Sequence, residues 1–340
     1  MASDEAIQLT NNDASNFKSY AVGRGYWNDP YVNIFASKQQ SQSSPVEHKP
    51  PEMSRGYFTR VSAIRNFVKQ FIEKTNQNCQ VVNLGAGYDT LYFNLFDSNK
   101  LPLKYVEIDF QRIVTSKIRL IKSKKILNDK MITQTNNEID KTNEEKPAGG
   151  FALPTLPGPP QVVHELHTLK YHITSCDLRN TNDLDKRLKE CNLDFTLPTL
   201  FIFECVLIYM NSTNSHNLLK YLSSSFQSLC LINYEQINLN DKFGEIMLSN
   251  MELRACKLLG VDVCKSIQTQ IERFENAGFS KDLIRVKTMT DYYLNVLDQN
   301  ERERIESIEF LDETELFFQL MDHYCVCQVA NAESLKNILF

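Results

Sequence analysis

Five short apolar runs, separated by segments of helical periodicity, constrain the fold of this sequence more than any other feature. Such runs are typical of strands buried on both faces of a parallel sheet whose connections are helices. The pattern therefore predicts an α/β fold with a doubly wound, mostly parallel sheet. The predicted strands are residues 80–84, 105–109, 171–176, 199–209 and 229–236. Helices are predicted at 60–74, 111–127, 214–227, 241–259 and 312–321, with a final strand at 323–330.

Charge and cysteine content limit the classes of partner. The net charge of -5 argues against nucleic acid, because binding to a phosphate backbone needs a basic surface. No apolar run approaches the length of a membrane helix, and the acidic start MASDEAIQLT lacks the features of a signal peptide, so we expect a cytoplasmic protein. The nine cysteines show no C-x-x-C spacing, so we expect neither disulfides nor a metal site.

Two low-complexity segments interrupt the globular pattern. Residues 38–52 are rich in Gln, Ser and Pro, and residues 129–162 combine polar residues with a Pro/Gly cluster. Both compositions are typical of surface loops or insertions rather than packed elements. The remainder is continuous enough to predict that residues 1–340 form a single domain.

The sharpest local motif is VVNLGAGYDT at 81–90, in which a strand runs into Gly85-Ala86-Gly87. Glycines at such a turn let the backbone approach a ligand at the carboxyl edge of the sheet. A lone G-x-G is weak evidence, because this one lacks the third glycine of a dinucleotide fingerprint and the G-K-[ST] of a phosphate loop. Both glycines have the alternative of being ordinary turn residues.

Acidic residues lie at the ends of the strands that follow the glycine motif. Asp109 lies 24 positions after Gly85, about the distance at which an acidic side chain binds ribose hydroxyls, and Glu107 on the same strand face is the rival candidate. Asp177 is placed to accept an adenine amino group, and Leu178 to cover the ring.

Glu204 is a charged residue inside the apolar run PTLFIFECVLIYM, where a carboxylate is costly unless it is paired. Its alternative is membership of a structural ion pair, and Asp109 and Asp177 have the alternative of capping helices. Jointly, the glycines and the acidic residues indicate a site for an adenosine-containing cofactor.

These motifs resemble the S-adenosylmethionine-dependent methyltransferases with a Rossmann-like fold, and more narrowly the leucine carboxyl methyltransferase family. The resemblance implies S-adenosylmethionine as cofactor and methylation of the C-terminal leucine carboxylate of the type 2A protein phosphatase catalytic subunit. The segments that carry it are NDASNFKSYAVGRGYWNDPYV (12–32), SRGYFTRV (54–61), QVVNLGAGYDT (80–90), KYVEIDF (104–110), CDLRN (176–180), LPTLFIFECVLIYM (197–210), INYEQINLNDKFG (232–244) and ESIEFLDETEL (306–316).

The resemblance also implies which residues bind the cofactor. It selects Asp109 over Glu107, and it adds Lys18 and Arg60, which composition alone would leave as exposed charges. A planar guanidinium suits either the methionine carboxylate of the cofactor or the terminal carboxylate of the substrate, and Arg55 is the runner-up for this role. The full set implied is Lys18, Arg60, Gly85, Asp109, Asp177, Leu178 and Glu204.

The expected reaction needs no general base, because a terminal carboxylate is already ionised at neutral pH. Arg60 and Tyr209 are the candidate catalytic residues, the second because it ends the predicted strand that carries Glu204; its alternative is a core aromatic residue. Residues 1–56 are expected to form an N-terminal helical lid on a catalytic core at 57–340. The aromatic-rich segment 20–31 within them has the alternative of a packed subdomain.

Two other functions remain open at this stage. The first is a related carboxyl methyltransferase that acts on a hypermodified tRNA base, whose relatives carry kelch repeats that are absent from this sequence. The second is a non-catalytic scaffold that binds the phosphatase. We expect a monomer, because no heptad or apolar surface stripe requires a dimer.

Overall fold

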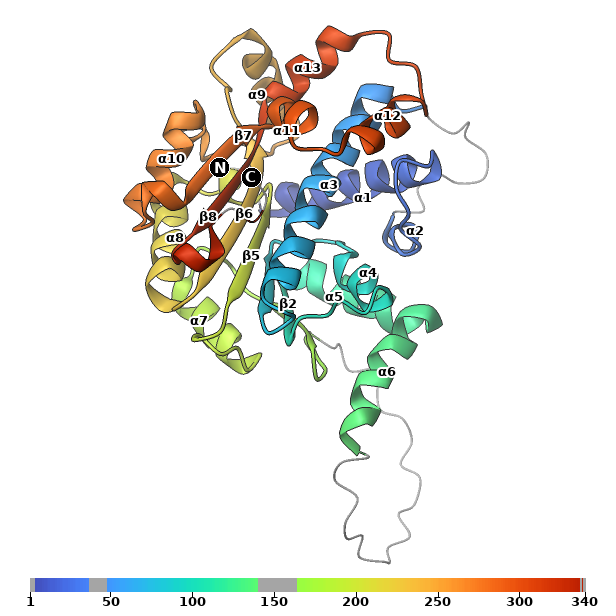
Figure 1. Cartoon of the computed structure of the whole chain (residues 1–340), viewed down its shortest axis with the longest axis vertical. Coiled ribbons are helices and arrows are strands. Elements are labelled where there is room, and N and C mark those ends of the chain that lie inside the picture. The colour runs from blue at the N-terminus through green and yellow to red at the C-terminus, as the bar shows by residue number, and fades with distance from the viewer. Residues whose placement is uncertain (1–3, 37–47, 140–163, 337, 339–340) are drawn as a thin grey trace, which may run out of the picture.

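The computed structural model describes residues 4–36, 48–139, 164–336 and 338. Within these residues, one eight-stranded sheet with the order β3-β4-β2-β1-β5-β6-β8-β7 forms the centre of the molecule (Figure 1). The strands are β1 (Gln80–Leu84), β2 (Lys104–Asp109), β3 (Leu166–His167), β4 (Tyr171–Ser175), β5 (Thr199–Glu204), β6 (Leu229–Gln236), β7 (Ile284–Thr288) and β8 (Tyr324–Ala330).

The five central strands, β4, β2, β1, β5 and β6, run parallel to one another. Leu84 at the end of β1 pairs with Ile108 of β2 and Phe203 of β5, so the carboxyl ends of these strands meet at one edge. β3, β7 and β8 pair antiparallel at the two sides of the sheet. The predicted doubly wound, mostly parallel α/β fold is therefore confirmed.

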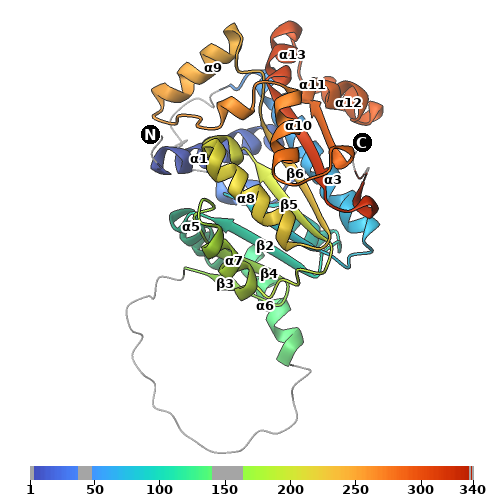
Figure 2. The same cartoon turned by 90° about the vertical axis from the view of Figure 1, so that its left-hand side faces the viewer.

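Helices cover both faces of the sheet, with α3 lying across one face and α7, α8 and α10 on the other (Figures 1 and 2). The α-helices are α1 (Asp4–Gly23), α2 (Val32–Phe35), α3 (Pro51–Lys74), α4 (Leu91–Asp97), α5 (Gln111–Ser123), α6 (Lys125–Ile139), α7 (Thr181–Glu190), α8 (Ser212–Ser225), α9 (Lys242–Leu253), α10 (Ile267–Asn276), α11 (Met289–Asn295), α12 (Gln299–Glu306) and α13 (Thr314–Asp322). Short 3₁₀ turns lie at Leu207–Tyr209, Val261–Val263, Lys281–Leu283 and Glu333–Leu335. No helix in the described ranges is both long and apolar enough to cross a bilayer.

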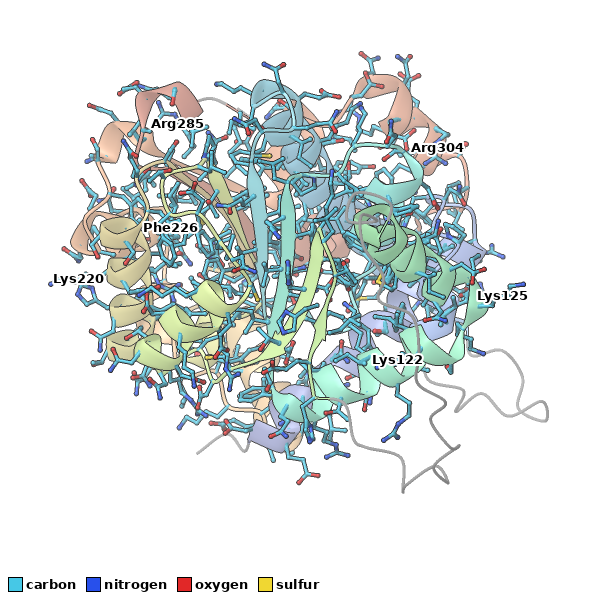
Figure 3. All side chains as sticks on the ribbon, turned by 90° about the horizontal axis from the view of Figure 1, so that it is seen from below. Lys122, Lys125, Lys220, Phe226, Arg285 and Arg304 are labelled. Atoms are coloured by element: carbon cyan, nitrogen blue, oxygen red, sulfur yellow. The ribbon has the colours of Figure 1, made fainter. Side chains whose placement is uncertain are left out.

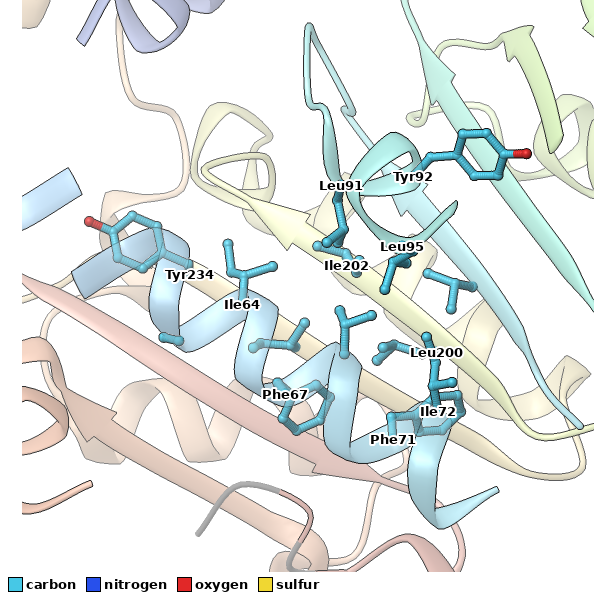
Figure 4. Close-up of a cluster of buried hydrophobic side chains, with 14 of the residues drawn as sticks. Ile64, Phe67, Phe71, Ile72, Leu91, Tyr92, Leu95, Leu200, Ile202 and Tyr234 are labelled. Carbon is cyan, nitrogen blue, oxygen red and sulfur yellow. The ribbon is translucent and has the colours of Figure 1, made fainter. Parts of the chain in front are cut away.

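The core is divided by the sheet into two apolar layers. On one side, Phe67 and Phe71 of α3 are one helical turn apart and pack toward Leu200 and Ile202 of β5 (Figure 4). The alternate β5 residues, including Phe201, belong to the layer under α7, α8 and α10. Because side chains alternate across a strand, this one apolar strand supplies both layers and fixes the sheet at the centre.

Several predicted boundaries are wrong. The predicted helix 60–74 begins earlier, at Pro51, and the predicted helix 241–259 ends earlier, at Leu253. The predicted strand 199–209 ends at Glu204, because Cys205 has a φ of 57° and turns the chain into the 3₁₀ turn Leu207–Tyr209. The predicted helix 111–127 is two helices, α5 and α6, which meet at Lys124.

The predicted loop 129–162 is also wrong in its first part, because α6 continues to Ile139. Leu127 and Met131, one turn apart on α6, are buried in the core, while Lys122 and Lys125 project from the surface of α5 and α6 (Figure 3). Residues 140–162 of that prediction lie outside the described residues. The same holds for 38–47 of the predicted loop 38–52, whose last two residues begin α3.

Candidate active site

A cavity of about 400 Å³ lies at the carboxyl edge of the sheet, where the parallel strands end. The N-terminal helix α1 supplies ten of its lining residues, so it covers the ends of the strands. Every residue predicted for the site lines this one cavity, namely Lys18, Arg60, Gly85, Asp109, Asp177, Leu178, Glu204 and Tyr209. The structure thus brings together residues that lie as far apart in the sequence as α1 and the end of β5.

The glycine turn after β1 requires both of its glycines. Gly85 has a φ of +69° and Gly87 a φ of +50°, a region that side-chain-bearing residues rarely adopt. A Cβ at Gly85 would lie 2.5 Å from Cγ2 of Val206, and a Cβ at Gly87 would collide with Asn11 Oδ1 of α1. Tyr88 N donates to the same Asn11 oxygen at 2.8 Å, so α1 packs directly on this turn.

Asp109 is held by backbone donors at the end of β2. Gly87 N donates to its Oδ2 at 2.7 Å, and Phe110 N donates to its Oδ1 at 2.6 Å. Burial nonetheless raises the pKa of Asp109 above its usual value. Each oxygen keeps a second lone pair, so the carboxylate can accept further hydrogen bonds from ligand hydroxyls.

Glu107, the alternative candidate to Asp109, forms a buried ion pair outside the cavity. Its side chain is only 1% exposed and its Oε2 lies 2.5 Å from Lys117 Nζ, which also donates to Asp89 O at 2.8 Å. Glu107 does not line the cavity, whereas Asp109 does. The geometry therefore agrees with the choice of Asp109.

Asp177 and Leu178 follow the end of β4. Arg179 donates to both carboxylate oxygens of Asp177, from Nε to Oδ1 at 2.8 Å and from Nη2 to Oδ2 at 2.7 Å. Partial burial opposes ionisation, but these hydrogen bonds outweigh it and lower the pKa of Asp177. Arg179 also donates to Asp4 at the start of α1, so this end of the cavity is closed by charge pairs.

Glu204 joins the two predicted cationic residues at the end of β5. Its Oε1 lies 2.8 Å from Lys18 Nζ and 2.5 Å from Arg60 Nε, and all three side chains are at most 16% exposed. Burial opposes ionisation, but the two cations lower the pKa of Glu204 to about 2. With two cations and one carboxylate, the group has a net positive charge that suits an anionic ligand.

Two aromatic rings lie close to the guanidinium of Arg60. Its guanidinium lies 4.8 Å from the ring centre of Tyr234 and 5.5 Å from that of Tyr57, distances at which cation–π attraction operates. Tyr57 lies three residues before Arg60, so both side chains leave the same face of α3. The sequence analysis missed Tyr57, although helical spacing from Arg60 would have indicated it.

Tyr209 lies in the 3₁₀ turn after β5 and lines the cavity near Cys205 and Tyr324. Burial raises the pKa of the Tyr209 phenol, so this group stays protonated at neutral pH. It can therefore donate a hydrogen bond or present an aromatic face, but it cannot act as a base. Cys205 and Tyr324 were not predicted, because the turn at Cys205 and the approach of β8 are not visible in the local sequence.

Arg55 and the aromatic segment 20–31 do not line the cavity. Arg55 is buried and donates to Glu309 O at 3.1 Å, so it does not serve as the runner-up to Arg60. Tyr26 and Tyr31 pack in the core and not over the cavity. The packed alternative therefore describes this segment, and α1, which ends at Gly23, is the element that covers the cavity.

Comparison with known proteins identifies the family. The sequence profile of leucine carboxyl methyltransferase matches residues 6–223. Leucine carboxyl methyltransferase 1 of Bos taurus is 40% identical over 99% of this chain and 94% of its own length, and that of Caenorhabditis elegans is 38% identical over 96% and 91%. The chain belongs to the leucine carboxyl methyltransferase family. A putative methyltransferase from Thermobifida fusca, 10% identical with a TM-score of 0.53 over 93% of this chain and 94% of its own, shares the fold.

The family assignment makes the chain a methyltransferase whose methyl donor is S-adenosylmethionine. The cavity has free hydrogen-bonding capacity for such a ligand. Asn11 Nδ2 and Gln8 Oε1, three residues apart on α1, are buried cavity atoms without a hydrogen-bond partner among the described residues. They add an unsatisfied donor and an unsatisfied acceptor to the acidic and cationic groups, so the residues present fit a zwitterionic nucleoside.

Proposed function

We propose that this enzyme transfers the methyl group of S-adenosylmethionine to the α-carboxylate of the C-terminal leucine of the type 2A protein phosphatase catalytic subunit. The observation that carries the proposal is the buried group of Lys18, Arg60 and Glu204, which has two cations for one carboxylate. The names of the relatives give the leucine carboxyl group as the acceptor of those proteins. The phosphatase as the source of that leucine rests on the resemblance of the motifs.

The residues of the cavity divide between the two ends of the cofactor. Asp109 faces the ribose from the end of β2, and Asp177 and Leu178 lie toward the adenine. Glu204 suits the ammonium of the methionine part, and Arg60 or Lys18 suits a carboxylate, either of the cofactor or of the substrate. Tyr209 lines the cavity together with Met251 of α9, and the two side chains pack in the same apolar cluster.

The sulfonium supplies an electrophilic methyl group, so the reaction is an in-line displacement by a carboxylate oxygen. That oxygen is already ionised, so no residue has to remove a proton. The protein holds the methyl group and the carboxylate in line, and this orientation lowers the activation barrier by up to several kcal/mol. It also excludes water from the two groups. A cation near the carboxylate orients it, and the pairing of both cations with Glu204 limits how strongly they attract the reacting oxygen.

The experiment uses purified enzyme, methyl-labelled S-adenosylmethionine and the phosphatase catalytic subunit, either intact or lacking its terminal leucine. Base-labile label on the intact subunit alone is expected, because a methyl ester is hydrolysed by base. Label that resists base, or that also appears on the truncated subunit, would contradict the proposal.

Binding of S-adenosylmethionine is measured separately by calorimetry. Binding without transfer to the phosphatase would contradict the phosphatase as substrate, and transfer to tRNA instead would favour the base-modifying alternative. Absence of binding would favour the non-catalytic scaffold.

A further inference from the structure

A second cluster of side chains with metal-binding chemistry lies at the opposite end of β4 from Asp177. His167 of β3 and His172 of β4 are direct cross-strand partners, so their side chains leave the same face of the hairpin. Their Nδ1 atoms are 3.0 Å apart. Cys191, the residue that follows α7, brings a thiol to the same place, and the three ligand atoms lie within 4.8 Å of one another.

We infer that His167, His172 and Cys191 form a zinc-binding site that joins the β3–β4 hairpin to the end of α7. Imidazole and thiolate are the ligands that Zn²⁺ prefers, and a tetrahedral zinc places two imidazole nitrogens about 3.3 Å apart. The observed separation of the two nitrogens needs only a few tenths of an ångström of movement. The same ion places the sulfur about 3.5 Å from each nitrogen, so the thiol, which lies within 4.8 Å of them, moves by up to about 1 Å. Because His167 is exposed while His172 and Cys191 are buried, the fourth position is open to water.

The residues around His167 orient it as a metal ligand. Its Nε2 lies 3.3 Å from Glu165 Oε2, and Glu165 Oε1 is fixed by Arg187 Nη1 at 2.6 Å and Thr174 Oγ1 at 3.2 Å. A proton held on Nε2 by this carboxylate leaves the Nδ1 lone pair directed at the cluster. A carboxylate behind a ligating imidazole is a usual companion of zinc sites.

His172 has its polar contact on the same side. Its ring is 3% exposed, and its Nε2 has no hydrogen-bond partner among the described residues, so the Nδ1 side facing the cluster is where the ring makes its polar contact. Cys191 is fully buried, and its sulfur lies within 4.8 Å of the ligand atoms of both histidines. Zinc would displace the thiol proton of Cys191 to the solvent and form one Zn–S and two Zn–N bonds, with no redox change.

The inference is independent of the proposed function, because these residues do not line the cofactor cavity. A zinc ion at this site would hold the β3–β4 hairpin against the end of α7. It would take no part in methyl transfer, because the cofactor cavity lies beyond the opposite end of β4. Residue spacing did not indicate this site, because Cys191 lies 19 positions after His172 and no ligand pair has the usual C-x-x-C or H-x-x-x-H spacing.

The test strips the full-length protein with a chelator under reducing conditions and titrates it with Co²⁺, a spectroscopic substitute for Zn²⁺. Equimolar binding is expected, with visible bands of a tetrahedral ion and a near-ultraviolet band of thiolate-to-cobalt charge transfer. His167→Ala, an exposed and therefore tolerated change, is expected to lower the affinity by at least about 10-fold. Cys191→Ser is expected to abolish the near-ultraviolet band.

The matched controls are His216→Ala and Cys256→Ser, which change a histidine and a buried cysteine outside the cluster. Both are expected to keep the bands and the affinity of the unmodified protein. Competition of Zn²⁺ against bound Co²⁺ should erase the spectrum. Titration of Zn²⁺ into the stripped protein should give heat that depends on the ionisation enthalpy of the buffer, because a thiol proton is released. A stripped protein that gives no thiolate band, or a band that survives Cys191→Ser, would overturn the inference.

Discussion

At the scale of single residues, two acidic side chains on one strand have opposite environments. Glu107 is fully enclosed with Lys117, and burial raises its pKa to about 7 in spite of that cation. Asp109, two residues later, reaches the cavity and is held by two backbone N–H groups. The sequence indicated both candidates but could not choose between them. The choice depends on position along β2: Glu107 lies inside the strand and forms a buried pair with Lys117, whereas Asp109 ends the strand and lines the cavity.

The first prediction concerns Asp109→Ala. The change removes the acceptor that we propose for the ribose hydroxyls, so the affinity for S-adenosylmethionine should fall by about 1–3 kcal/mol, measured by isothermal titration calorimetry. Asp262→Ala, at an exposed position outside the cavity, is the control and should bind normally. An unchanged affinity in Asp109→Ala would remove Asp109 from the cofactor site.

The second prediction concerns the pH dependence of stability due to Glu204. Its pKa falls from an ordinary value of 4.5 to about 2 in the folded protein, because Arg60 and Lys18 outweigh burial. This difference corresponds to about 3 kcal/mol of stabilisation, complete above about pH 5 and lost as the pH falls toward 2. The free energy of unfolding of the unmodified protein should therefore exceed that of Glu204→Gln at neutral pH, and the excess should shrink in acid.

The measurement is urea unfolding of both proteins at a series of pH values. Glu245→Gln is the control, because Glu245 is exposed on α9 and its pair with Lys242 is open to solvent. It should follow the unmodified protein throughout. An excess stability that stays constant between pH 6 and pH 3 would show that Glu204 does not keep a lowered pKa.

At the scale of elements, apolar periodicity located the central strands and failed where the chain changes direction. The predicted bounds of β1 and β6 agree with the structure, because β1 ends where Gly85 begins the turn and β6 begins after the polar pair Gln227 and Ser228. The end of β5 was misplaced because apolar residues continue through the turn at Cys205. β3 and β7 escaped notice, because an edge strand has few buried residues to produce a pattern.

The same reasoning explains the error over α6. Its apolar positions are few and its polar composition is typical of a loop, yet Leu127 and Met131 are buried and Lys130 pairs with Asp97 of α4. One apolar residue per turn against a preformed surface is enough to hold a helix that its own periodicity would not predict.

The third prediction tests whether α6 is part of the core. Leu127→Ala should lower the free energy of unfolding by about 2–4 kcal/mol, since it removes a fully buried side chain. The adjacent Ile126→Ala is the control, because Ile126 is 52% exposed and should have little effect. Equal and small effects of the two changes, measured by chemical denaturation, would mean that α6 is not packed against the core.

At the scale of the whole molecule, α1 connects segments that are distant in the sequence. Three of its side chains form ion pairs: Asp4 with Arg179, Asp13 with Arg254, and Lys18 with Glu204. The first two pairs are exposed and contribute little to stability, whereas the third is largely buried. A cofactor in the cavity would add contacts between α1 and the ends of the strands, where the protein alone has unsatisfied atoms.

The fourth prediction is that S-adenosylmethionine protects α1 more than other surface helices from hydrogen exchange. If local opening of α1 exposes the cofactor, a ligand concentration 100-fold above its Kd should slow the exchange of α1 amides by up to about 100-fold, equivalent to about 2.7 kcal/mol. Helix α12 is the internal control, because it does not line the cavity and its local opening releases no ligand. Asp109→Ala at the same ligand concentration should show weaker protection of α1, since less of the protein is bound. If calorimetry shows binding while α1 and α12 respond equally, then α1 does not close over the cofactor, and the lid role expected of residues 1–56 would be lost with it.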